Sequence, residues 1–298
     1  MSDKAKATQR NVSSARPHPR ALPIERNAAQ MRLARPTMTT IPAVLPPLPP
    51  LRSWRRAVAP ADAFVWLAAG WRDLTIRPTA SLGYGLLVFL ISAALVYGLV
   101  VLEVDYILFP AFAGFMVVGP ILGIGLYAKS RGIALGRPVG LMRMIFVSPA
   151  SGGQVLFAGV LLCLLVMLWM RAAVIIYALF FGLVEFPGLA HVAPMLFATP
   201  AGWAMLIVGG AVGGLFAAFS FGISAFSIPM LLDEPVDALT AMGTSMALVW
   251  HNLPTMLTWA AIVVALFVAC FATGMVGLIV VFPVLGHGTW HAYRAMKR

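Results

Sequence analysis

Charged residues are scarce in this chain of 298 residues. They make up 10% of the sequence, and apolar residues make up 61%, whereas soluble domains are about one quarter charged. A chain of this composition cannot form a water-soluble globular core. It predicts an all-α polytopic membrane protein, because a helix satisfies its own backbone hydrogen bonds in lipid.

Cysteines and catalytic motifs are also scarce. The two cysteines, Cys163 and Cys270, lie inside apolar segments, without the spacing of a metal site or a redox pair. The first fifty residues contain no apolar stretch, so we expect no cleaved signal peptide. The chain has no GxSxG, HExxH or phosphate-loop motif and no paired intramembrane carboxylates. We therefore expect no enzymatic activity and no cofactor.

Basic residues and prolines gather at the N-terminus. Residues 1–60 contain eleven Lys or Arg, two acids and ten of the 22 prolines. This composition predicts a disordered cytoplasmic tail over 1–60, followed by a membrane domain over 61–298. The tail has neither the aromatic interleaving nor the fold of a nucleic-acid-binding module, so we expect membrane lipids rather than nucleic acid as its partner.

The remaining residues predict three units, each a short amphipathic helix followed by a transmembrane hairpin. The amphipathic helices begin at Asp62, Arg137 and Asp233, and a loop is predicted from Glu185 to Pro200. Six apolar segments are each long enough to cross a bilayer. They are residues 82–102, 106–128, 155–183, 203–232, 255–272 and 275–293.

The first and third units resemble each other. VVGPILGIGLYAKSR (117–131) matches VVFPVLGHGTWHAYR (280–294), and Trp71-Arg72-Asp73-Leu74 matches Trp250-His251-Asn252-Leu253. This pattern indicates a duplication, and the shared proline predicts a kink.

Basic residues also predict the orientation. Twenty of the 21 Lys and Arg lie in the tail, the first amphipathic helix, the loop after the second span and the C-terminus. With six spans these segments share one side, so both termini are expected in the cytoplasm of a bacterial cell, with the chain in the inner membrane.

The remaining basic residue, Arg171, lies inside the third span. An intramembrane charge usually faces the bundle interior and has a partner. We expect an ion pair with Glu103, Asp105 or Glu185, or bonds to free carbonyls. The alternative is an anion-coordinating role in a transport path.

His287 and His291 lie four residues apart on one face of the last predicted span. Two histidines with this spacing can supply two ligands of a metal site. The predicted topology brings His251 and Asp233 to the same membrane face, so a zinc or iron site is one interpretation. The other interpretation is that these histidines simply lie at the membrane interface.

Small residues follow one face of the fourth span. Gly209/Gly213 and Gly210/Gly214 form two overlapping GxxxG motifs, and Ser220, Ser224 and Ser227 continue the stripe. Close helix packing is one interpretation. A polar path lined by the serines is the other.

Three motifs resemble an uncharacterised family of bacterial integral membrane proteins, the domain of unknown function 2189 family. They are Gly70-Trp71-Arg72-Asp73-Leu74 with Pro78, the segment Ser227–Asp233 and the closing segment Pro283–Arg294. The resemblance runs from about Asp62 to the C-terminus and implies a six-span membrane protein without a stated activity. Some members carry a loose cytochrome c oxidase subunit label, which would imply association with a respiratory complex.

The interpretation that we favour is a non-enzymatic inner-membrane protein that acts as a scaffold, assembly or accessory component of a membrane complex, with lipids and other subunits as partners. One alternative is a small-solute or anion permease that uses Arg171 and the serine stripe. Another is a metal- or haem-linked redox accessory protein that uses His287 and His291.

Overall fold

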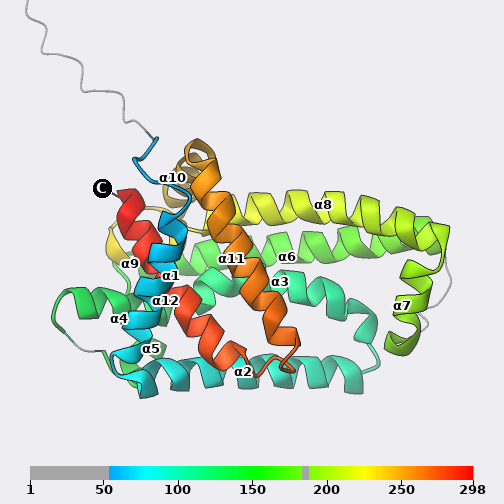
Figure 1. Cartoon of the computed structure of the whole chain (residues 1–298), viewed down its shortest axis with the longest axis horizontal. Helices are drawn as coiled ribbons and strands as arrows, with labels where there is room; N and C mark the ends of the chain where they lie inside the picture. Colours follow the sequence, from blue (N-terminus) through cyan, green and yellow to red (C-terminus); the bar gives the residue numbers. More distant parts are fainter. Residues whose placement is uncertain (1–53, 138, 183–187, 298) are drawn as a thin grey trace, which may run out of the picture. The chain divides into compact units, whose positions relative to one another are not determined.

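The computed structural model describes residues 54–137, 139–182 and 188–297. Within these ranges the chain forms helices and no strands, which confirms the all-α prediction (Figure 1). The predicted tail lies outside the described residues, except for residues 54–60. The elements are α1 (Asp62–Thr75), α2 (Pro78–Val101), η2 (Asp105–Ile107), α3 (Leu108–Leu122), α4 (Ile124–Ala134), α5 (Leu141–Ile145), α6 (Gly152–Phe181), α7 (Leu189–Phe197), α8 (Pro200–Ser224), α9 (Ser227–Asp233), α10 (Ala238–His251), α11 (Leu253–Phe271) and α12 (Leu278–Lys297).

Five helical segments in the described part of the chain are long and apolar enough to cross a membrane. They are Pro78–Val101, Leu108–Ala134, Gly152–Phe181, Pro200–Asp233 and Leu253–Phe271. The sixth predicted span does form a helix, α12, but it does not meet this criterion. Its C-terminal half contains His287, His291 and Arg294, and their polarity interrupts the apolar run. The multi-span prediction is therefore confirmed, with five such helices where the sequence predicted six.

Only one of the two matching proline-containing segments is divided into two helices. The second span contains Pro120 and divides at Gly123 into α3 and α4. Proline removes one helical hydrogen bond, which makes such a division less costly. In contrast, α12 continues through Pro283 without a break.

The predicted loop before the fourth span is partly wrong, because it contains α7. Thr199 then begins α8 as its N-cap, since its hydroxyl accepts a hydrogen bond from the Gly202 amide at 2.9 Å. Glu185, at the start of that predicted loop, lies outside the described residues.

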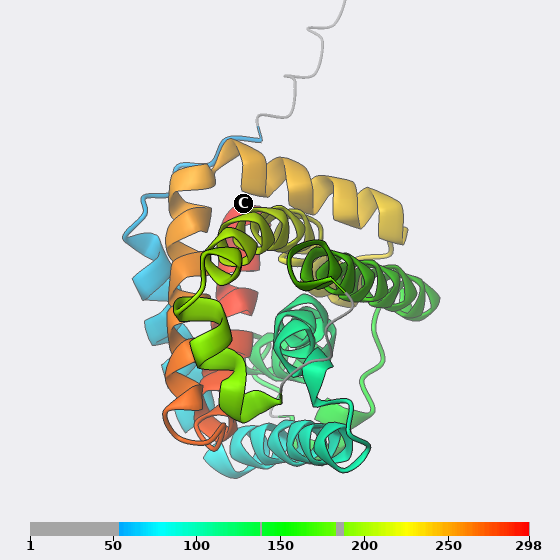
Figure 2. The same ribbon diagram turned by 90° about the vertical axis from the view of Figure 1, so that its right-hand side faces the viewer.

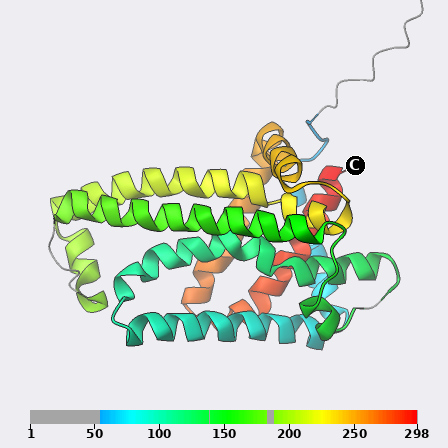
Figure 3. The same cartoon turned by 180° about the vertical axis from the view of Figure 1, so that it is seen from behind.

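Four long helices, α8, α6, α3 and α2, are stacked side by side, and α11 and α12 cross them obliquely (Figures 1 and 3). The helix α7 lies at one end of this stack, which faces the viewer in Figure 2. The short helices α4, α5 and α9 lie at the opposite end, together with the end of α12. The stack has two distinct ends, and the polar side chains described below lie at the end opposite α7.

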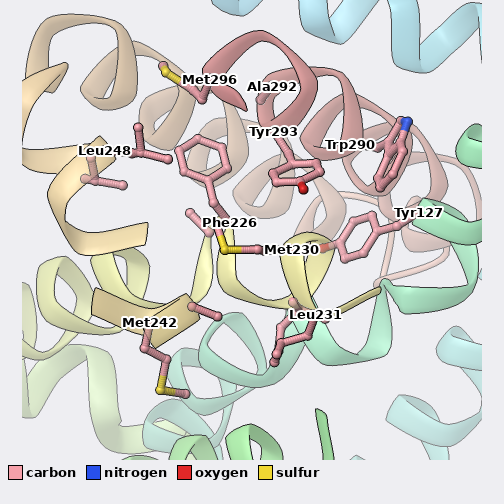
Figure 4. Close-up of a cluster of buried hydrophobic side chains, with 14 of the residues drawn as sticks. Tyr127, Phe226, Met230, Leu231, Met242, Leu248, Trp290, Ala292, Tyr293 and Met296 are labelled. Atoms are coloured by element: carbon pink, nitrogen blue, oxygen red, sulfur yellow. The ribbon is translucent and has the colours of Figure 1, made fainter. Parts of the chain in front are cut away.

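A buried apolar cluster holds this second end together (Figure 4). Tyr127 and Trp290, which occupy equivalent positions in the two matching segments, both belong to it and are 2% and 1% exposed. Beside the cluster, α1 and α12 approach so closely that a Cβ at Gly70 would meet the Val284 carbonyl oxygen and would lie 2.7 Å from the Gly288 amide nitrogen. The Gly70 position therefore requires glycine, and this close contact fixes α1 on α12.

Candidate functional site

Polar side chains from four helices meet in the interior beside this cluster. Asp73 comes from α1, Ser81 from α2, Lys129 and Ser130 from α4, and His287 from α12; none of these residues is more than 2% exposed. Buried polar groups are costly unless they are hydrogen-bonded. No side-chain nitrogen or oxygen that is buried in the described part of the chain lacks a hydrogen-bond partner.

The hydrogen bonds of this polar network form one continuous chain. The Ser130 hydroxyl donates to Asp73 Oδ2 at 2.7 Å, so its oxygen is free to accept from His287 Nδ1 at 2.8 Å. A neutral imidazole with its proton on Nδ1 accepts at Nε2, where the Ser81 oxygen lies 2.9 Å away. The Lys129 ammonium then donates to Ser81 Oγ at 2.6 Å and to the Arg77 carbonyl at 3.1 Å. Each buried polar side-chain atom of the network thus has at least one hydrogen-bond partner.

Asp73 is the acceptor at the end of the network. His291 Nε2 also lies 2.8 Å from Asp73 Oδ2, and the His291 side chain is 26% exposed. Burial alone would raise the pKa of the Asp73 carboxyl, but the hydrogen bonds from His291 and Ser130 outweigh it and hold the pKa below its ordinary value. Asp73 is therefore a buried carboxylate, and it balances the buried Lys129 without touching it.

A serine beside a lysine and a histidine resembles an activated nucleophile. However, Ser81 and His287 are both fully buried, at 0% exposure. A substrate would reach the Ser81 hydroxyl only if α2 and α12 separated. The arrangement links four helices and is suited to holding them in register.

A second polar cluster joins α4, α9 and α12 near the C-terminus. Asp233 pairs with Arg131 at 3.2 Å and with Lys297 at 2.7 Å. Glu234 accepts hydrogen bonds from Lys297 and Tyr293, both at 2.9 Å. Burial alone would raise the pKa of the Glu234 carboxyl, but these two donors lower it below its ordinary value.

The structure brings together two of the four predicted metal ligands. His287 and His291 are linked through Ser130 and Asp73. The other two lie elsewhere: His251 is exposed with Nδ1 2.8 Å from the Ala247 carbonyl oxygen, and Asp233 is held by ion pairs. Among the described residues, no three His, Cys, Asp or Glu side chains are grouped as a metal site requires.

Arg171 lies on an exposed face of α6. The expected ion pair with Glu103 is not present. Of the other two expected partners, Glu185 lies outside the described residues, and the side chain of Asp105 is not described.

Ser220 and Ser224 line an apolar groove, and Ser227 donates to the Ser224 carbonyl at 3.5 Å. The groove has a cavity volume of about 630 Å³ and lies between α3, α8, α10, α11 and α12. Nearly all of its other lining side chains are hydrocarbon or aromatic, including Trp169, Trp259 and Phe267. Its surface fits an apolar occupant better than a hydrated solute.

The sequence interpretation missed Asp73, Ser81, Lys129 and Ser130 as a group. Two signals were available. Lys129 is a charge at the end of an apolar segment, and Asp73 lies in the motif that recurs around Asn252. Asn252 is also buried, and it bonds to the Trp54 and Leu248 carbonyls at 2.9 and 2.7 Å. The third position of this motif is therefore a buried polar anchor in both places.

Residues 108–233 match the model of a family described as predicted integral membrane protein (DUF2189). No curated protein and no solved structure matches the chain. The matched range includes the Ser227–Asp233 motif, whereas the motifs around Trp71 and Trp290 lie outside it, and the description gives no support to an oxidase label. The resemblance is therefore confirmed over residues 108–233: the chain matches this family of predicted integral membrane proteins.

Proposed function

We propose that the chain is a non-enzymatic scaffold, assembly or accessory component of a membrane complex, which binds an apolar helix of a partner subunit along α8. One observation supports this proposal above the others. A Cβ added at Gly210 or Gly214 would have no neighbouring atom within 4 Å. These two glycines form a GxxxG motif, the pattern that lets two membrane helices approach closely.

The overlapping motif on the same helix provides the contrast. Gly209 and Gly213 face α6, where a Cβ would lie 3.8 Å from Ile176 and 2.9 Å from Trp169. The chain therefore uses one of its two GxxxG motifs for its own packing. The other has no helix against it in the described part of the chain.

The apolar groove extends this open face. Ala217 and Ala218, one turn beyond Gly214, are exposed and line the groove with α11 on its other side. Small residues followed by a wide apolar groove suit an apolar helix laid against α8, with its larger side chains in the groove. The apolar lining gives no support to a solute path along the serines.

We place the protein in the bacterial inner membrane with both termini in the cytoplasm. The start of the helical unit and its C-terminal end support this, because they lie together: Arg56 Nε donates to the Met296 carbonyl at 2.8 Å. The end of the stack opposite α7 also holds Lys129, Arg131 and Lys297. Cytoplasmic loops are enriched in such residues.

We also propose that the first and third units arose by duplication. The equivalent residues Asp73 and Asn252 are both buried polar anchors, and the equivalent Tyr127 and Trp290 are both in the core. Similar burial at matching positions is what two copies of one unit would retain.

The experiment uses quantitative mass spectrometry to measure which proteins co-purify from native membranes with the wild type, a test variant and a control variant. The test variant is Gly210→Leu/Gly214→Leu, which fills the open face of α8. The control is Gly98→Leu on α2, where a Cβ also meets nothing within 4 Å. We expect a partner protein that co-purifies with the wild type and the control, and is lost from the test variant. A wild-type chain without any reproducible partner, or equal partner levels in both variants, would refute the proposal.

A further inference from the structure

A crevice lies between α1 and α12, on a surface that does not include α8. It has a volume of about 560 Å³, and its lining includes Trp66 and Arg72 from α1 and His291 and Arg294 from α12. The Gly70 contact and the bond between His291 and Asp73 hold these two helices together. The crevice is therefore a fixed feature of the fold.

Two arginines give the crevice its charge. Within the described part of the chain, neither Arg72 nor Arg294 has a carboxylate partner. Arg131, which is equivalent to Arg294 in the other matching segment, is instead bound by Asp233 and by the Leu232 carbonyl at 3.0 Å. Arg294 is thus available for a ligand, whereas Arg131 is not.

The third polar side chain of the crevice, His291, is hydrogen-bonded to Asp73, which lies behind it. Because the Asp73 side chain is only 3% exposed, its negative charge lies beneath the crevice and not on its surface. The accessible polar groups of the crevice are therefore two guanidinium groups and one imidazole. Guanidinium groups bind phosphate oxygens in a bidentate manner.

Apolar side chains lie next to these cations. On α1, Phe64, Val65 and Trp71 are 59%, 61% and 54% exposed, and Val65 also lines the crevice. Exposed aromatic residues beside arginine are typical of the zone where acyl chains meet headgroups. A ligand of this surface therefore has an anionic group and a hydrocarbon part.

We propose that the crevice binds the phosphate group of an anionic phospholipid, with Arg72 and Arg294 on the phosphate and the acyl chains along the apolar face of α1. Basic pockets between helices on the cytoplasmic side bind such headgroups. This site is separate from the proposed partner face, because it shares no residue with the Gly210/Gly214 surface of α8.

The test uses the full chain, purified in detergent, and measures lipid binding by native mass spectrometry. The test variant is Arg72→Gln/Arg294→Gln. The control, Arg137→Gln/Arg143→Gln, removes the same charge from exposed arginines outside the crevice. Two lost arginine–phosphate contacts predict about 30-fold weaker binding of phosphatidylglycerol to the test variant. The control is expected to change the affinity for phosphatidylglycerol by less than about threefold, because salt screens distant exposed charges.

Two further probes separate the parts of the ligand. Diacylglycerol has the same chains without phosphate, and glycerol phosphate has the phosphate without chains. We expect both to bind much more weakly than phosphatidylglycerol. Equal binding of diacylglycerol, or equal losses in the two double variants, would overturn the phosphate site. Equal binding of glycerol phosphate would overturn the lipid assignment and indicate a site for free phosphate compounds.

Discussion

Replacing Asp73 with alanine is expected to destabilise the protein strongly. Asp73 is 2% exposed and accepts hydrogen bonds from Ser130 and His291. Its removal leaves Lys129, which is 1% exposed, as a buried charge without an opposite charge in the same network. Removing one partner of a buried charge pair costs about 3–5 kcal/mol. We therefore expect the free energy of unfolding to fall by about 4 kcal/mol in Asp73→Ala.

The control for this change lies on the same helix. Asp62 is a partly exposed acid whose carboxylate accepts one hydrogen bond, from the Ala59 amide at 2.8 Å. Asp62→Ala removes the same charge but leaves no buried lysine behind, so its cost is about 1 kcal/mol or less. Both variants are measured by unfolding with sodium dodecyl sulfate in mixed micelles, followed by far-UV circular dichroism.

A double variant tests the reason for the loss. When Lys129→Met is added to Asp73→Ala, both buried charges are gone, and such replacements are often neutral or stabilising. We expect the double variant to be more stable than Asp73→Ala alone by about 2 kcal/mol. If Lys129→Met brings no recovery, or if Asp73→Ala costs no more than Asp62→Ala, the buried charges are not coupled and the reasoning is wrong.

Three other predictions use the same unfolding assay. Gly70→Ala forces a methyl group into the α12 backbone and should lower the free energy of unfolding by about 3 kcal/mol. Gly243 has open space around it, so Gly243→Ala should stabilise the protein by up to about 1 kcal/mol. Equal effects of the two changes would contradict the close contact of α1 with α12. The pKa values of Asp73 and Glu234 are lower in the folded protein than in the unfolded chain. The two carboxylates therefore stabilise the fold fully when the pH is above their unfolded-state pKa values, and this stabilisation is lost as the pH falls below about 4. A free energy of unfolding that is constant from pH 6 to pH 3 would contradict this. Arg171→Leu should change stability by less than about 0.5 kcal/mol, since its side chain is exposed on α6; a loss of several times that amount would indicate a buried partner.

The helices were largely predictable from the sequence because they depend on local properties. Apolar length indicated the membrane helices, and the predicted start at Asp62 is the first residue of α1, where acids are favoured. The predicted start of the third amphipathic helix at Asp233 was wrong, because Asp233 ends α9 and α10 begins at Ala238 with Asp237 as its N-cap. The helix α7 was missed because Gly188 and Pro200 flank it and Pro194 lies inside it, which together resemble a loop.

The polar network was not predictable, because it depends on which helices lie side by side. Asp73 and His291 are 218 positions apart in the chain, and Ser81 and His287 are 206 apart. Neither spacing carries a local signal. The sequence did show His287 and His291 on one helical face, but the partners that it suggested for them, His251 and Asp233, bond elsewhere.

The most direct test of the proposed function is a cryo-electron microscopy structure of the protein purified from its native membrane without overexpression. We expect continuous helical density from another polypeptide against Gly210 and Gly214, with side chains that extend into the groove between α8 and α11. A map in which only lipid chains cover that face, in particles that contain this chain alone, would contradict the proposal.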